Sequence, residues 1–197
     1  MSHTIFIHLG TYADGERCGQ TIKNLFDNAK DPSKVFVGVI EQNKNESPED
    51  PECIVTYCAL QNPNIDREEI KKKFQASERV KDSCPHFRQI RFLGVYHIAA
   101  KGPAYARSFA RKLLANEEYC MQVDAHSDFI SNWDEIAKSE WANIGNEYGV
   151  LSNIPANINN KAKDESSNDR IVPQMCVLGA LDTNIPVCRI PKETYLR

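Results

Sequence analysis

The sequence predicts an α/β fold in which a mostly parallel sheet is flanked by helices. Three observations support this prediction. The chain opens as strand, helix and strand, with short apolar runs at residues 4–10 and 35–40 on either side of a helical pattern. A second helical pattern, at residues 102–115, leads into another short apolar run at 119–123. Continuous apolar runs are typical of strands that are covered on both faces, as in parallel sheets.

The elements of the first half follow from spacing and from turn residues. Residues 18–29 place Ile22, Leu25 and Phe26 on one helical face, and Asp31-Pro32 ends this helix. Four less regular segments complete this half: a surface loop at 43–52, a short strand at 53–60, an exposed helix or loop at 65–81, and a strand at 87–95.

The second half begins with the helix at 102–115. Pro103 suits its first turn, where the missing N–H costs little, and Ala106, Phe109 and Leu113 recur at helical spacing. The expected elements downstream are a strand at 119–123, a helix that carries Trp133, Ile136 and Trp141, strands at 149–152 and 172–180, and a mobile loop at 156–170.

Length and charge limit the classes of protein. A chain of 197 residues predicts a single domain over residues 1–197. The net charge of −3 excludes a strongly basic nucleic-acid binder, so no nucleic-acid partner is expected. No apolar run is long enough to span a membrane, and the first residues lack the pattern of a signal peptide. The sequence therefore predicts a cytoplasmic protein.

Seven cysteines are scattered along the chain without a Cys-x-x-Cys pair. Free buried thiols are the simplest interpretation of this pattern. The alternative is a zinc site built from Cys53, Cys58, Cys84 and His86, whose spacing is irregular and is interrupted by Pro85.

The run at 119–123 ends abruptly in Asp124-Ala125-His126. In open α/β sheets, ligands bind beyond the carboxyl ends of the strands. A carboxylate and an imidazole that leave one strand end together suit a divalent ion such as Mn²⁺, which can hold a diphosphate. Asp124 and His126 are therefore the candidate metal ligands. The structural alternative is an Asp that caps the next turn beside a solvated His.

Four further side chains are candidate donor-binding residues. Lys101 and Arg107 lie at the start of the helix before this strand, where cations beside a diphosphate are chemically sensible. Tyr12 and Asp14 follow the first strand and are expected at the same sheet edge as Asp124. Tyr12 is expected to stack on a base and Asp14 to accept a hydrogen bond. Asp14-Gly15 is equally a common turn pair.

These residues resemble the protein-hydroxyproline N-acetylglucosaminyltransferase family. The motifs that carry the resemblance are Tyr12-x-Asp14, Lys101-Gly-Pro-Ala-Tyr-Ala-Arg107, Gln122-Val-Asp-Ala-His126-x-x-Phe129-x-x-x-Trp133-Asp134 and Val150-Leu-Ser152. The resemblance runs from about Ile5 to Arg197, and the Asp-x-His block is its most specific part.

The resemblance implies a GT-A glycosyltransferase fold and transfer of N-acetylglucosamine from UDP-N-acetylglucosamine to a protein hydroxyl. It implies manganese or another divalent cation as cofactor, an acceptor protein as partner, and retention of the anomeric configuration. By position, Asp124 and His126 would hold the metal, and Tyr12, Asp14, Lys101 and Arg107 would bind the donor. Asp124 and Arg107 would be the catalytic residues.

The sequence departs from the family pattern in four ways. Lys101 replaces an Arg, Ala125 replaces a Ser, and Asn153-Ile-Pro155 replaces Thr-Tyr-Pro. The chain also ends at Arg197, before the part of the family that supplies acceptor contacts and a further metal ligand. It therefore resembles a donor-binding part that is truncated at its C-terminus, and slow or absent transfer is expected.

Other functions stay open on the same residues. One alternative is a non-catalytic or weakly active module that binds a nucleotide sugar or a protein. Another is an enzyme similar to the polypeptide N-acetylgalactosaminyltransferases, which share the Asp-x-His block. A simple nucleoside-diphosphate binder is a third. A Rossmann oxidoreductase is disfavoured because no Gly-x-Gly-x-x-Gly follows the first strand.

Overall fold

The computed structural model describes residues 3–44, 50–75, 84–152, 177–180 and 186–189. The chain divides into two compact units, Met1–Glu140 and Trp141–Arg197. The expected single domain over residues 1–197 stays a prediction.

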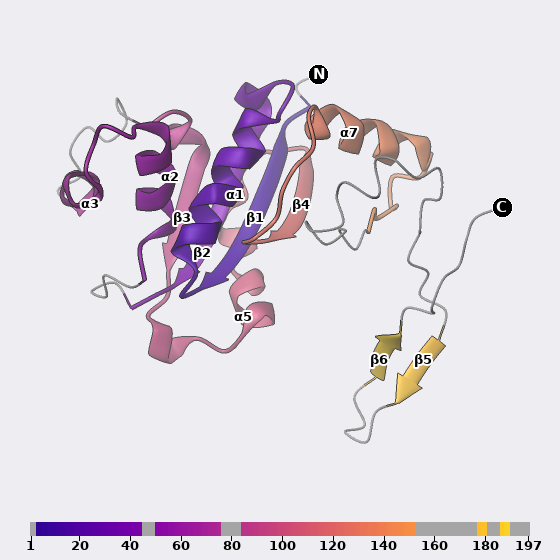
Figure 1. Ribbon diagram of the computed structural model, residues 1–197. Helices are drawn as coiled ribbons and strands as arrows, with labels where there is room; N and C mark the ends of the chain where they lie inside the picture. Colours follow the sequence, from indigo (N-terminus) through magenta and orange to yellow (C-terminus); the bar gives the residue numbers. More distant parts are fainter. Residues whose placement is uncertain (1–2, 45–49, 76–83, 153–176, 181–185, 190–197) are drawn as a thin grey trace. The chain divides into compact units, whose positions relative to one another are not determined.

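The first unit is built on a sheet of four parallel strands in the order β3-β2-β1-β4 (Figure 1). The strands are β1 (Ile5–Tyr12), β2 (Val35–Gln42), β3 (Ile90–Gly94) and β4 (Tyr119–Asp124). The predicted α/β class with a mostly parallel sheet is confirmed. The chain adds β2 and β3 on one side of β1 and then returns to place β4 on the other side.

One face of the sheet packs against α1 (Gly15–Asp27) and is called the α1 face. Helix α1 lies across this face in Figure 1, and α2 (Cys53–Gln61) packs against α1. A Cβ atom at Gly19 would stand 2.6 Å from the Thr56 Cβ, so glycine permits this close approach of the two helices. The main buried apolar residues on this side are Ile5, Ile7, Leu9, Val35, Val37, Val39, Ile22, Leu25 and Tyr57. Helix α3 (Arg67–Gln75) follows α2.

The cysteines of the α1 face form two disulfides, Cys18–Cys53 and Cys58–Cys84. The expectation of free thiols is wrong for these four residues, and the zinc alternative is wrong with it, because three of its four proposed ligands are oxidised. His86 instead stacks on Phe26 at 4.4 Å between ring centroids. Among the cysteines whose side chains are described, Cys120 is free and exposed.

The opposite face packs against α5 (Pro103–Ser108) and α6 (Ala110–Leu113) and is called the α5 face. The helix expected at 102–115 is thus interrupted at Phe109. Arg91 of β3 extends over the Phe6 and Phe36 rings and donates a hydrogen bond to the Leu113 carbonyl at 2.7 Å. Three short 3-10 turns complete the unit: Pro32–Lys34, Phe87–Gln89 and His97–Ala99.

Helix α7 (Trp133–Asn143) is tied to the end of α1 by buried side chains. The Trp133 indole N–H donates to the Leu25 carbonyl at 2.9 Å. The Asp134 carboxylate accepts from the Lys30 and Asp31 backbone N–H groups at 2.6 and 3.0 Å. Trp133 and Asp134, part of the family-like motif, therefore act in packing.

Two sequence expectations are corrected along the chain. Residues 53–60 form helix α2 rather than a strand. The segment is apolar on all sides of this helix, and its first six residues are buried. The strand expected at 87–95 is shorter, because a 3-10 turn occupies Phe87–Gln89.

The second unit contains an antiparallel pair of strands, β5 (Val177–Ala180) and β6 (Pro186–Arg189). The strand predicted at 149–152 is absent, and the Gly149 carbonyl instead accepts a hydrogen bond from the Trp141 indole N–H at 3.1 Å. The mobile loop expected at 156–170 lies outside the described residues, as does the first part of the strand expected at 172–180.

Candidate functional site

The strand order creates a switch point between β1 and β4. The chain leaves β1 toward β2 on one side and reaches β4 on the other, so the connections diverge at this pair. In open parallel sheets such a divergence opens a ligand crevice at the carboxyl ends of the two strands. Tyr12 is the last residue of β1, and Asp124 is the last residue of β4. Tyr12 is 57% exposed.

The turn after β4 is fastened to α1 through Thr21. The buried Thr21 hydroxyl donates to the Ala125 carbonyl at 3.1 Å and accepts from the Ser127 N–H at 3.0 Å. Asn24, one turn further along α1, accepts from the Phe129 N–H at 2.6 Å. Ala125 is buried, whereas Asp124 and His126 on either side of it are exposed. The turn therefore presents both candidate metal ligands to solvent.

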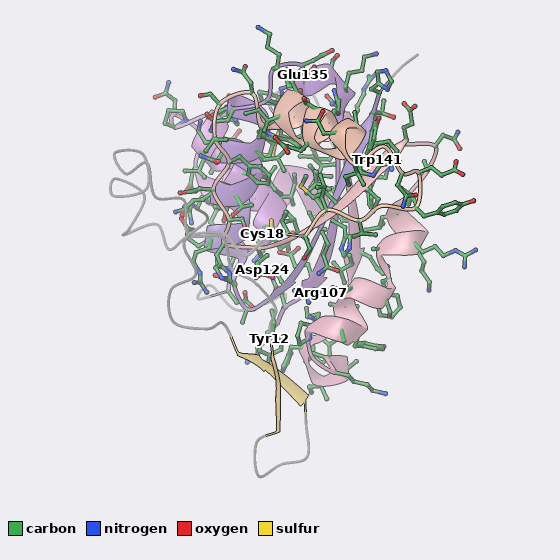
Figure 2. The ribbon with its side chains drawn as sticks, turned by 90° about the vertical axis from the view of Figure 1, so that its right-hand side faces the viewer. Tyr12, Cys18, Arg107, Asp124, Glu135 and Trp141 are labelled. Atoms are coloured by element: carbon green, nitrogen blue, oxygen red, sulfur yellow. A yellow bond between two sulfur atoms is a disulfide. The ribbon has the colours of Figure 1, made fainter. Side chains whose placement is uncertain are left out.

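Helix α5 approaches the sheet at the same end. A Cβ atom at Gly10 would stand 3.2 Å from the Ala106 Cβ, so the glycine and the small alanine let α5 lie close to β1. The next residue, Arg107, places its Nη2 atom 2.8 Å from the Asp124 Oδ1 atom. Figure 2 shows Tyr12, Arg107 and Asp124 toward one end of the first unit, with Glu135 at the opposite end.

His8 lies two residues before Gly10 on β1, so both are on the α5 face of the sheet, and His8 is buried. Burial, and secondly the positive charge of Arg107, lower the pKa of His8 below its usual value. The His8 imidazole is thus neutral near pH 7 and adds no positive charge beside Arg107. Its Nδ1 atom has no hydrogen-bond partner within the described part of the chain.

The carboxyl end of β2 carries a half-buried acid on the α1 face. The Glu41 carboxylate accepts hydrogen bonds from the Cys53 N–H at the start of α2 and from the Asn43 amide. Burial raises the pKa of Glu41 to about 7, and the nearby Glu52 and Asp50 carboxylates act in the same direction. Glu41 therefore links the carboxyl end of β2 to Cys53, the first residue of α2, which also forms the disulfide with Cys18.

Two of the predicted donor-binding residues are engaged locally. The Asp14 carboxylate pairs with the Arg17 guanidinium at 2.7 Å, at the beginning of α1. The Lys101 Nζ atom lies 5.6 Å from the centroid of the Tyr105 ring. Among the contacts of the described residues, none joins Asp14 or Lys101 to Asp124. The structure thus brings Arg107 to Asp124 and gives no such contact for the other two.

Asp124 and His126 fit a divalent ion in donor chemistry and exposure. A carboxylate oxygen and an imidazole nitrogen, both reachable by solvent, are ligands that Mn²⁺ accepts. Within the described residues, no three His, Cys, Asp or Glu side chains gather to form a complete metal site.

Comparison with known families identifies the chain. A model of the glycosyltransferase (GlcNAc) family matches residues 4–190. The chain belongs to this family. A search of curated proteins finds no match. Among solved structures, the crystal structure of S. aureus TarS is similar with a TM-score of 0.42 and 13% sequence identity, over 77% of this chain and 24% of that chain. The chain thus spans about a quarter of the length of TarS.

Three contributors to the site escaped the sequence analysis of this GlcNAc glycosyltransferase family member. Thr21 was readable as a polar residue at helical spacing from Cys18 and Leu25, which is the signal of a buried hydroxyl with a partner. Gly10 and His8 carry no comparable signal, because their roles depend on how closely α5 packs on β1.

Among the described helices, none has the length and apolar character that crossing a bilayer requires.

Proposed function

We propose that this chain binds UDP-N-acetylglucosamine with a divalent cation and transfers the sugar, with retention of configuration, to a protein hydroxyl of the hydroxyproline type. The observation that supports it is the convergence of Tyr12, Arg107 and Asp124-Ala-His126 at the switch point of a sheet in a GlcNAc glycosyltransferase family member. The acceptor class rests on the family resemblance of the motifs.

Each side chain has a role that matches its position. Asp124 and His126 would hold the cation, which neutralises charge on the leaving diphosphate when it is bound. Arg107 would bind the diphosphate through its guanidinium, which matches phosphate geometry. The exposed Tyr12 ring would stack on the uracil. Asp124 and Arg107 are the proposed catalytic residues.

Asp14 and Lys101 are proposed donor ligands that must first leave local partners. Asp14 would exchange Arg17 for a ribose hydroxyl or a ring N–H, and Lys101 would move from the Tyr105 ring to a phosphate. Arg17 and Lys101 are exposed, so the Asp14 ion pair and the contact of Lys101 with the Tyr105 ring both contribute little.

The cytoplasmic location stays a prediction, and the two disulfides weigh against it. Disulfides persist in oxidising compartments and are uncommon in the cytosol. Mass spectrometry of the alkylated native protein, taken from the cell without reductant, distinguishes the two locations by the state of Cys18 and Cys53.

A transfer assay tests the proposed function. Labelled UDP-N-acetylglucosamine, Mn²⁺ and a protein that contains hydroxyproline are incubated with the chain, and sugar on the protein and free sugar are measured separately. Multiple turnovers on the protein support the full proposal. Donor binding with neither transfer nor hydrolysis identifies the non-catalytic module instead. UDP-N-acetylgalactosamine as a competing donor distinguishes the polypeptide N-acetylgalactosaminyltransferase-like alternative.

A further inference from the structure

The Asp124 carboxylate is paired with a cation of the protein itself. The Arg107 Nη2 atom lies 2.8 Å from Asp124 Oδ1, which is a full hydrogen-bonded ion pair. Arg107 is held there by α5, because the preceding residue, Ala106, packs on Gly10 near the carboxyl end of β1. The proposed metal ligand and the proposed diphosphate ligand therefore neutralise each other.

This ion pair is exposed enough to be exchanged. The two side chains are 37% and 59% exposed for Arg107 and Asp124. Solvent screens such pairs, so little is lost when the partners separate. The buried His8, whose pKa is lowered by burial and by the Arg107 charge, adds no positive charge that would repel the guanidinium. The pair is thus weak enough to yield to a ligand.

We propose that Arg107 is an internal counter-ion that competes with the divalent cation for Asp124 and transfers to the donor diphosphate when cation and nucleotide bind together. The inference rests on the proposed function and adds a coupling between its two ligands. Cation alone must displace Arg107 with no new partner for the guanidinium. Cation with a nucleoside diphosphate gives both charges a partner of opposite sign.

The consequence is positive coupling between metal and nucleotide. Each ligand raises the affinity for the other by the same factor, since binding free energies are linked. Loss of the Arg107 charge then has two opposite effects. It relieves competition at Asp124, which strengthens binding of cation alone, and it removes a diphosphate ligand, which weakens the coupling.

Arg107→Gln tests this inference in the full chain, with Arg111→Gln as the matched control. Arg111 is exposed on α6 and has no part in the proposed site. Free Mn²⁺ is measured by electron paramagnetic resonance during titration, with and without UDP. Arg107→Gln is expected to bind Mn²⁺ alone about two- to fivefold more tightly than wild type. The UDP-dependent gain in Mn²⁺ affinity is expected to fall about tenfold or more. Arg111→Gln is expected to match wild type in both.

A second variant separates competition from a general charge effect. In an Asp124→Asn background the carboxylate that Arg107 pairs with is gone, so Arg107→Gln is expected to leave the affinity for Mn²⁺ alone unchanged. If Arg107→Gln binds Mn²⁺ alone no more tightly than wild type, or if Arg111→Gln strengthens it equally, the counter-ion role is wrong while the proposed function stands. If wild type binds UDP no better with Mn²⁺ than without it, the proposed function fails, and this inference fails with it.

Discussion

The two faces of the parallel sheet differ in what covers them and in what they expose. The α1 face is sealed by α1 and α2, with two disulfides and a continuous apolar core. The α5 face carries two helices of six and four residues, a charged Arg91 and an exposed ion pair at its edge. We therefore expect the α1 face to supply most of the stability, and the α5 face to present the proposed ligand site at the switch point.

The turn after β4 joins the two faces. Thr21 of α1 forms hydrogen bonds with the Ala125 carbonyl and the Ser127 N–H of this turn, while the Asp124 and His126 side chains are exposed. A rigid site built on a stable face needs little ordering when a ligand binds. Changes to the α1 face should thus alter stability strongly, and changes to the α5 edge should alter binding with little loss of stability.

Removal of the disulfides is expected to have the largest effect. The cross-links span 35 and 26 residues of sequence, and each is expected to contribute about 3–4 kcal/mol to the free energy of unfolding. Thermal unfolding with and without reductant measures this loss, and a Cys58→Ser/Cys84→Ser variant isolates one bond. An alkylating agent should not react with the four disulfide cysteines of the native protein. If it modifies all of Cys18, Cys53, Cys58 and Cys84, the two disulfides that cross-link the α1 face are not formed.

Glu41 is expected to make the α1 face sensitive to pH. Its pKa rises from 4.5 to about 7 on folding, so the folded state favours the protonated acid. This contribution to stability is complete below pH 4.5 and is lost as the pH rises through 7. The free energy of unfolding should fall by up to about 3 kcal/mol over that interval.

Glu41→Gln removes this titration and keeps an oxygen that accepts from the Cys53 N–H. Relative to wild type, the variant is expected to gain stability at pH 8 and to gain little at pH 4, as measured by denaturant unfolding. Glu135→Gln, which removes an exposed carboxylate of α7 and its ion pair with Lys138, is the control and should change the free energy of unfolding by less than about 1 kcal/mol. An identical pH profile in wild type and Glu41→Gln would contradict the assignment.

Thr21→Val is expected to have a smaller effect on stability and a clear effect on the site. It removes the two hydrogen bonds that Thr21 makes to the turn after β4, at a cost of about 1–3 kcal/mol. Thr56→Val is the control on the same buried face, since the Thr56 hydroxyl has no partner within the described residues and its loss should be nearly neutral. Calorimetry of UDP binding with Mn²⁺ should show weaker binding for Thr21→Val alone. Equal binding in the two variants would mean that the turn does not need Thr21.

The sheet was predictable because its strands are short apolar runs with clear ends, as at residues 35–40. Helix α2 was not, since a segment that is apolar on all sides has no period that separates helix from strand. The disulfides were hidden because cysteine spacing does not indicate which pairs meet in space. The position of Asp124 and His126 at a strand end was readable from the sequence. Their pairing with Arg107 was not, because it depends on the strand order and on the contact between Gly10 and Ala106.

The most direct test of the account is the manganese dependence of UDP binding in Asp124→Asn, with Asp128→Asn as the control from the same exposed loop. UDP affinity is measured by calorimetry in Mn²⁺ and again in chelator. Wild type and Asp128→Asn are expected to bind UDP about tenfold or more tightly in Mn²⁺, whereas Asp124→Asn should bind with nearly the same affinity in both. An equal gain from Mn²⁺ in Asp124→Asn and wild type would contradict the placement of the cation at the end of β4.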